Sequence, residues 1–179
     1  MARATPSISA LTSGACFSAA MQANAAEVFR IGTFADAMPI LTEKLADLNL
    51  AGPIRLAPSI TREWPAASAL TRETGTTDGT DPVCLSRAWM AIADTGTLVL
   101  QSGPDNPTRL NFLADYHGVF LQESRIVDTK QAVWKALEQQ GKLPRALNFI
   151  SGPSRTADIE QTIQLGAHGP RSLWIFIHP

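Results

Sequence analysis

Residues 151–170 bring together side chains that bind anions and side chains that move protons. The segment has the sequence SGPSRTADIEQTIQLGAHGP, so Arg155, two acids and His168 lie in one short stretch. An arginine beside free N–H groups at a turn favours a phosphate or carboxylate ligand. A histidine can exchange a proton near neutral pH. This segment is therefore the first candidate for a binding or catalytic site.

The first part of the segment is predicted to turn a strand into a helix. Gly152 permits a left-handed exit from the apolar strand before it. Ser154 or Thr156 can then cap the following helix. That helix would carry Ile159 and Ile163 on its buried face.

Charged residues at this turn support two interpretations. Arg155 and the free N–H groups at the start of the helix favour an anion. Asp158 and Glu160 lie in the first helical turns and would repel an anion that they faced. The turn, which begins at Ser151, is thus either an anion-binding turn or a purely structural helix cap.

The second part of the segment places a histidine in a glycine loop. His168 lies between Gly166 and Gly169, and Pro170 keeps Gly169 out of the α region. Such a backbone can bring the imidazole into a crevice, where it would act as a general acid or base. The alternative is a histidine that fixes its loop by donating a hydrogen bond.

An Asp-Thr-Gly-Thr segment is the second candidate. Gly96 favours a tight turn, and the hydroxyls of Thr95 and Thr97 can bind backbone groups of that turn. Asp94 would then point into solvent or a cleft. Aspartic proteases also carry Asp-Thr-Gly after an apolar run, and two of their carboxylates share one proton. We reject that interpretation, because the chain has a single copy and helix-rich surroundings.

Apolar periodicity predicts the elements that must position these residues. Apolar residues recur at helical spacing around Phe17 and Met21, again from Ile40 to Leu48, and over 129–140. Short apolar runs rich in β-branched residues predict strands between these helices. The predicted strands lie at 28–31, 54–57, 83–85, 97–100, 119–122, 147–150 and 173–177.

These nearly all-apolar strands decide the predicted fold class. Strands covered on both faces lose the alternation of a half-exposed antiparallel sheet, and intervening helices permit parallel crossovers. We therefore predict a three-layer α/β fold with a mostly parallel sheet and ligands at the carboxyl ends of its strands. The 179 residues suffice for one domain over 1–179. Within it, 1–15 would be irregular and 58–82 a surface excursion anchored by Trp64.

Composition excludes several classes of protein. Fifteen Lys and Arg balance sixteen Asp and Glu without a basic cluster, so no nucleic-acid partner is expected. No apolar run approaches the roughly 20 residues that span a bilayer. Cys16 and Cys84 are far apart and the first residues are too polar for a signal peptide, so a cytoplasmic protein is expected. No phosphate-binding glycine motif or cysteine cluster occurs, so we expect no cofactor, no metal and a colourless protein.

Taken together, the motifs resemble the LUD-domain family, within it the lactate-utilisation protein C group. The matching features occur in the family's order: ADTGTLVL at 93–100, a strand with His117, the loop at 151–160 and GAHGP at 166–170. The resemblance extends from about Val83 to the C-terminus. It implies a fold similar to the NagB/RpiA/CoA-transferase-like group.

The resemblance also implies participation in oxidising L-lactate to pyruvate beside partner proteins that carry iron–sulfur clusters. A cubane cluster is normally held by four thiolates, and this chain has two cysteines. It would therefore be a non-redox subunit or accessory protein whose loops hold a small anion or a partner segment. The alternative is a stand-alone enzyme on a sugar-phosphate or acyl-CoA-like substrate, with His168 or Asp94 as its acid or base.

We expect the candidate residues to converge on one crevice at the carboxyl edge of the sheet. The candidate ligand-binding residues are Asp94, Thr95, Gly96, Thr97, Ser151, Gly152, Ser154, Arg155, Thr156, Asp158, His168 and Gly169.

Overall fold

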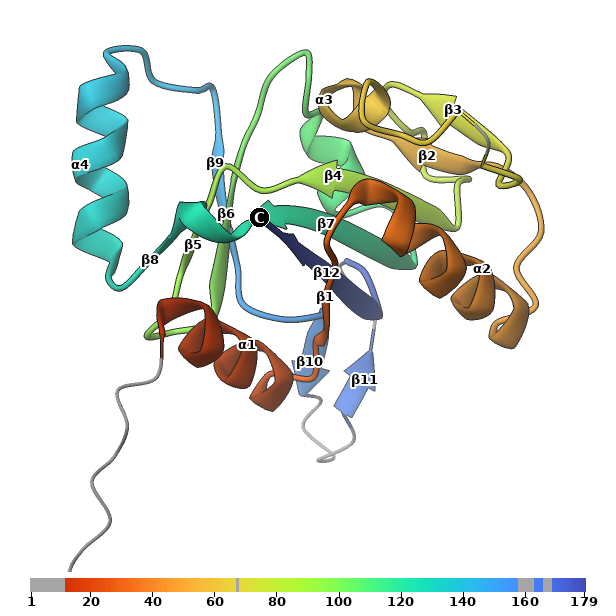
Figure 1. The fold of residues 1–179 in the computed structure, drawn as a ribbon, viewed down its shortest axis with the longest axis horizontal. Coiled ribbons are helices and arrows are strands. Elements are labelled where there is room, and N and C mark those ends of the chain that lie inside the picture. The colour runs from red at the N-terminus through yellow and green to blue at the C-terminus, as the bar shows by residue number, and fades with distance from the viewer. Residues whose placement is uncertain (1–11, 67, 158–162, 166–168) are drawn as a thin grey trace, which may run out of the picture.

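The main sheet contains six parallel strands. The structure, a computed structural model, describes residues 12–66, 68–157, 163–165 and 169–179 (Figure 1). In the main sheet the strand order is β1-β12-β7-β4-β2-β3, and every neighbouring pair runs parallel. This confirms the predicted α/β class with a mostly parallel sheet. The strands are β1 (Glu27–Arg30), β2 (Ile54–Leu56), β3 (Arg72–Thr74), β4 (Val83–Arg87), β7 (Tyr116–Gln122) and β12 (Ser172–His178).

A second sheet of four strands has the order β8-β5-β6-β9. In it β6 runs antiparallel to β5 and β9, whereas β5 and β8 are parallel. The predicted strands at 97–100 and 147–150 are present, but they lie in this sheet and not in the parallel one. The elements are β5 (Met90–Ile92), β6 (Thr97–Gln101), β8 (Ile126–Val127) and β9 (Leu147–Ile150).

In the described part of the chain, four α-helices accompany the sheets, and local signals explain where they begin and end. The Thr12 side chain accepts a hydrogen bond from the Ala15 N–H at 3.4 Å, so α1 begins at Ser13, inside the stretch predicted to be irregular. Gly141 ends α4 in the left-handed conformation. None of the described helices is long and apolar enough to cross a membrane. The helices are α1 (Ser13–Ala23), α2 (Ala37–Asp47), α3 (Pro58–Thr61) and α4 (Lys130–Gln140).

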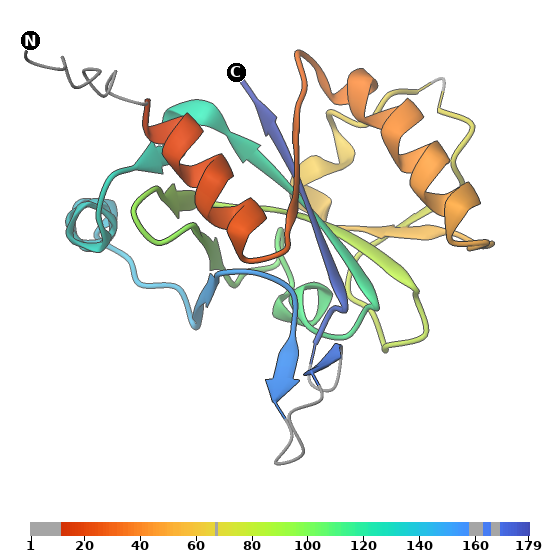
Figure 2. The same ribbon diagram turned by 90° about the horizontal axis from the view of Figure 1, so that it is seen from below.

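Apolar side chains fill the spaces between the layers. Alternate residues of the main-sheet strands face opposite cores, as Phe176 and Ile175 do in β12. The Phe176 face packs on α2, and the Ile175 face packs on α1 and the second sheet. The outer face of the second sheet packs on α4 through Val99 and Val133. Accordingly, α2 and α4 lie at opposite ends of the molecule in both views, with the sheets between them (Figures 1 and 2).

The prediction of a helix after Ser154 is wrong. Residues Arg155–Ala157 form β10 and residues Ile163–Leu165 form β11, and the two strands pair antiparallel. The sequence here contains β-branched residues at short intervals, which favour extended backbone over helix. Capping residues such as Ser and Thr are equally common in turns, so they did not decide between the two structures.

The segment 58–82 contains elements that the sequence did not predict. It forms α3 and then β3, which pairs with β2 at the edge of the main sheet. All three residues of β3 are exposed, so the strand has no apolar pattern that could reveal it. Trp64 is buried in the core beside α2, as its expected anchoring role requires. The Arg55 guanidinium binds the end of the segment, because its Nε donates a hydrogen bond to the Asp81 carboxylate at 2.9 Å.

Candidate functional site

A chain of hydroxyl groups connects the two segments that the sequence singled out. The Oγ1 atom of Thr97 lies 2.7 Å from Oγ of Ser151 and 2.8 Å from Oγ1 of Thr95. The antiparallel pairing of β6 with β9 explains this contact, because Leu98 at the start of β6 lies opposite Ile150 at the end of β9. The structure therefore brings the 94–97 turn and Ser151 together.

The hydroxyl chain borders a hollow of about 470 Å³, which we call the hydroxyl crevice. Lys130, the first residue of α4, lines it and supplies a positive charge beside the free N–H groups of the helix start. Its ammonium also lies 5.0 Å from the centre of the Phe149 ring. Asp94 lines the same hollow and opposes an anion there. The complete lining is Ile92, Asp94, Thr95, Thr97, Lys130, Gln131, Phe149 and Ser151.

Two glycines of the motifs fit both turns against α1. Gly96 has a φ of 57° and Gly152 a φ of 137°, values that side-chain-bearing residues rarely adopt. A Cβ atom on Gly96 would lie 2.7 Å from the Cβ of Ala20. A Cβ atom on Gly152 would lie 2.7 Å from the carbonyl oxygen of Asn24. These glycines are therefore explained by close packing.

A second cavity, of about 250 Å³, lies next to the first and shares Phe149 and Ser151 with it. We call it the inner cavity. Residues 149–154, Gly169 and Pro170 form one side of it, and Ser154 N–H donates to the Pro170 carbonyl at 2.7 Å. Asn111, Phe112, His117 and Leu173 also line it.

The inner cavity lies at the amino ends of two main-sheet strands. His117 and Leu173 are each the second residue of their strands, β7 and β12. The expectation of a site at the carboxyl edge is therefore wrong for this loop. The strand β9 belongs to the second sheet, where it runs antiparallel to β6. The loop that follows β9 therefore lies at the amino ends of β7 and β12 and not at the carboxyl ends.

His117 is the most perturbed ionisable group at the inner cavity. Its side chain is fully buried, and its Nε2 lies 2.7 Å from Oγ of Ser86. Burial lowers the pKa of His117 to about 3, so the imidazole is neutral at pH 7. Ser86 is also fully buried and does not line the cavity. It therefore positions the imidazole and is no nucleophile for a ligand in the cavity.

The inner cavity also contains residues that the sequence did not select. From the sequence, His117 was noted only as part of the family resemblance, and Asn111 was not noted at all. Asn111 is 1% exposed, and neither its Oδ1 nor its Nδ2 has a hydrogen-bond partner among the described residues. The one available signal was a polar residue inside the apolar run YHGVFL.

The other predicted residues are placed as follows. Gly152, Ser154 and Gly169 line the inner cavity. Arg155 is exposed on β10 and lines neither cavity. Thr156 is the middle residue of β10, so it caps no helix. Asp158 and His168 lie outside the described residues, as do the roles predicted for them.

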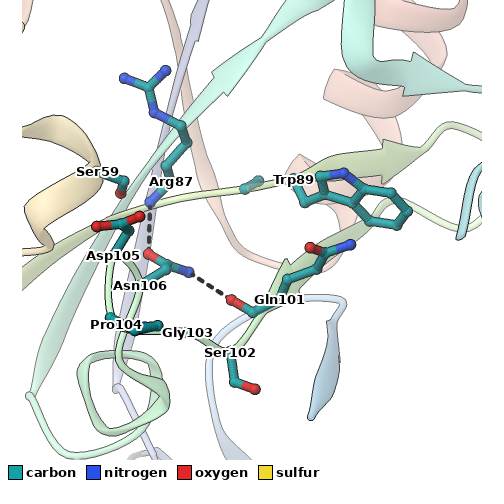
Figure 3. Close-up of a pocket in the computed structure, with 10 residues that line it drawn as sticks. Ser59, Arg87, Trp89, Gln101, Ser102, Gly103, Pro104, Asp105 and Asn106 are labelled. Atoms are coloured by element: carbon teal, nitrogen blue, oxygen red, sulfur yellow. Dashed lines mark hydrogen bonds between the residues drawn. The ribbon is translucent and has the colours of Figure 1, made fainter. Parts of the chain in front are cut away.

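A third cavity, of about 280 Å³, lies at the carboxyl end of β4 (Figure 3). The Asn106 amide lines it and lies between Arg87 and Gln101. The amide accepts a hydrogen bond from Arg87 N–H and donates one to the Gln101 carbonyl, both at 3.3 Å. The Arg87 guanidinium points away from Asn106 in this view, and it pairs with the Glu63 carboxylate. Its charge is thus already neutralised. Elsewhere in the described part of the chain, no three His, Cys, Asp or Glu side chains gather as a metal site would need.

Comparison with known proteins identifies the family. The LUD domain family model matches residues 62–177, a range that includes the hydroxyl crevice and the inner cavity. An uncharacterized protein of Neisseria meningitidis serogroup B is 40% identical over 91 residues, which are 50% of this chain and 39% of that protein. Lactate utilization protein C of Halalkalibacterium halodurans is 35% identical over 91 residues, 48% of this chain and 40% of that protein.

A solved structure supports the fold over nearly the whole chain. The crystal structure of a DUF162 family protein from Deinococcus radiodurans has a TM-score of 0.67 and 19% identity, and the match covers 92% of this chain and 94% of that one. The sequence matches are shorter, since this chain spans about two fifths of the length of the curated relatives. The family match covers well over half of the chain, and the chain therefore belongs to the LUD-domain family.

Proposed function

We propose that this chain works in lactate utilisation as a non-redox subunit or accessory protein. Relatives from several bacteria carry the name lactate utilization protein C. Burial raises the pKa of the Cys84 thiol to about 12, so this cysteine stays protonated and is a poor cluster ligand. The iron–sulfur clusters of such a system would therefore belong to its partner proteins.

We further propose that the hydroxyl crevice holds the anionic group of this system, a small carboxylate or an acidic segment of a partner. The observation that carries this proposal is the hydroxyl chain at Thr97, which lies beside the positive charge of Lys130. Hydroxyl donors, an ammonium group and free helix N–H groups all favour a carboxylate. A volume of about 470 Å³ is ample for a three-carbon acid.

Complementation of a deletion strain tests the crevice. Lys130→Ala should slow growth on L-lactate, while growth on glucose stays normal. The matched control is Lys135→Ala, since Lys135 is exposed on the same helix and does not line the crevice. Lys130 lies at the positive end of the helix dipole, so its removal should not destabilise α4. Equal growth of the two variants on L-lactate would contradict a carboxylate site at this crevice.

Asp94→Asn distinguishes a binding site from an acid–base enzyme. If the crevice binds a carboxylate, the loss of a nearby negative charge should strengthen L-lactate binding, measured by calorimetry, and preserve growth on L-lactate. If Asp94 were a general acid or base, the same change should abolish growth on L-lactate, because an amide cannot exchange the proton.

A further inference from the structure

The strand β9 is an edge of the second sheet. The strand order β8-β5-β6-β9 places it last, and in the described part of the chain β6 is the one strand that pairs with it. In an antiparallel pair, the backbone groups of successive residues point alternately to the partner strand and away from it. Every second residue of β9 therefore directs its N–H and C=O groups at the edge, where a further strand can pair.

The register identifies which residues face this edge. The Ser102 N–H donates to the Ala146 carbonyl at 3.0 Å, so these two residues form a hydrogen-bonded pair just before β9. Alternation then directs the backbone groups of Asn148 at β6, and those of Leu147 and Phe149 away from β6. Two donors and two acceptors, spaced about 7 Å along the strand, thus face outward.

Exposed aromatic side chains flank the same edge. The Phe149 ring contacts the Trp134 ring of α4 at a centroid distance of 5.9 Å. Trp134 is 43% exposed and Phe149 is 36% exposed. Phe112, which lines the inner cavity together with Phe149, is 40% exposed. Large exposed aromatic side chains beside outward-facing backbone groups are typical of a contact with another polypeptide.

Positive charge is concentrated around this edge. Residues 130–150, which form α4, the following loop and β9, contain four Lys or Arg, one Glu and no Asp, whereas the whole chain is nearly neutral. Lys130 lies over the Phe149 ring at 5.0 Å. The ion pairs between described residues include none of the four cations. The other three are Lys135, Lys142 and Arg145.

This charge selects among the possible occupants of the edge. A second copy of the chain would bring its own four cations, and like charges oppose that pairing. A nucleic acid would match the charge, but it has no peptide groups that could extend a sheet. An extended polypeptide with acidic side chains matches both the charge and the backbone groups.

We propose that β9 is a docking edge for an extended, acidic segment of a partner protein. The segment adds a strand beside β9, and its backbone pairs with Leu147 and Phe149. Its apolar side chains pack on Trp134, and its acidic side chains lie near Lys130. The inference rests on the role beside partner proteins proposed above, and it names how a partner segment reaches the hydroxyl crevice, which shares Lys130 and Phe149 with this edge.

Hydrogen exchange followed by NMR tests the backbone part on the unaltered protein. In the free chain, the amides of Leu147 and Phe149 should exchange fast and that of Asn148 slowly, because only Asn148 pairs with β6. The capped peptide ETVTVTE, at ten times its dissociation constant, should slow exchange at Leu147 and Phe149 about tenfold.

Two results of this experiment would contradict the proposal. Slow exchange of Leu147 and Phe149 in the free chain at every concentration would show that the edge is already covered. Slow exchange that becomes fast on dilution would identify a second copy as the occupant.

Peptide analogues test the charge and the strand pairing separately. By isothermal titration calorimetry at low salt, ETVTVTE should bind at least about tenfold more tightly than KTVTVTK. Backbone N-methylation of its two Val or of its three Thr blocks one edge of the added strand each, so one of these peptides should lose at least about tenfold in affinity and the other should not. Equal effects of the two methylations, equal affinity for the two charge forms, or no binding up to about 1 mM would overturn the proposal.

The variant Trp134→Ala tests the aromatic contact. It should weaken binding of ETVTVTE at least about tenfold and leave the melting temperature nearly unchanged, because the side chain is largely exposed. Leu143→Ala is the control, since Leu143 is 72% exposed after the same helix, and it should leave binding unchanged. Equal binding by the two variants would place the peptide elsewhere. Failure of these tests with a growth defect of Lys130→Ala on L-lactate would remove the docking edge and leave the proposed function standing.

Discussion

At the scale of single residues, His117 makes the stability of the fold depend on pH. Burial lowers its pKa to about 3, whereas an unfolded histidine has a pKa of about 6.5. Between these values the unfolded chain binds a proton that the folded chain does not bind. The contribution of His117 to the free energy of unfolding is therefore largest above pH 6.5 and falls on acidification towards pH 3, by up to about 1.4 kcal/mol per pH unit.

Urea denaturation between pH 4 and 7.5 measures this dependence. His117→Gln should give a flatter dependence of the unfolding free energy on pH than the unaltered protein. Burial also lowers the pKa of His178, so the remaining slope should have the same sign. His178→Gln is the control, and it should flatten the slope less, because His178 is only partly buried. Identical slopes for His117→Gln and the unaltered protein would mean that His117 is accessible to protons in the fold.

The candidate residues could be predicted in part. The polar turn at 94–97 and Ser151 were chosen because they combine hydroxyls and charge at turns, and they do meet. His117 and Asn111 were not chosen as site residues, because a single polar residue near an apolar run has no local partner to reveal its role. Ser86 becomes the partner of His117 only when β4 pairs with β7, and no local pattern predicts that pairing.

At the scale of elements, the docking of the 151–154 loop on α1 requires a glycine. Gly152→Ala should lower the free energy of unfolding by about 2–5 kcal/mol, because it combines backbone strain with a clash at the Asn24 carbonyl. Gly75→Ala is the matched control, since Gly75 has a similar φ of 122° but a Cβ atom added there would meet nothing within 4 Å. It should cost only the conformational part, about 1–3 kcal/mol. Equal losses in urea denaturation would show that the loop does not pack tightly on α1.

The sequence was informative about strands and helices, and less so about how strands associate. The run at 97–100 is apolar because β6 is packed on both faces of the second sheet. The run at 147–150 forms the edge strand β9 of the same sheet, which is only half-buried and exposes Phe149. An apolar run therefore predicts a buried strand without predicting its sheet. The strand β3 escaped prediction for the opposite reason, since its exposed polar residues have no apolar pattern and its place depends on pairing with β2.

At the scale of the whole molecule, one core joins both sheets. The cluster between them contains Leu98 of the second sheet, Val119 and Ile175 of the main sheet, and Phe17 of α1. Both sheets should therefore unfold in one transition, as expected for a single domain over the described residues. Leu98→Ala should cost about 2–5 kcal/mol and shift the far-UV and near-UV circular dichroism midpoints together. Two separate midpoints would indicate two independently folding units.

The central proposal is that this LUD-domain chain serves the oxidation of L-lactate to pyruvate. The most direct measurement is the rate at which resting cells of the native host consume L-lactate and pyruvate, with and without the gene. We predict that deletion sharply lowers L-lactate consumption, leaves pyruvate consumption unchanged, and is reversed by the gene on a plasmid. Unchanged L-lactate consumption in cells that lack the protein, or an equal loss of pyruvate consumption, would contradict the account.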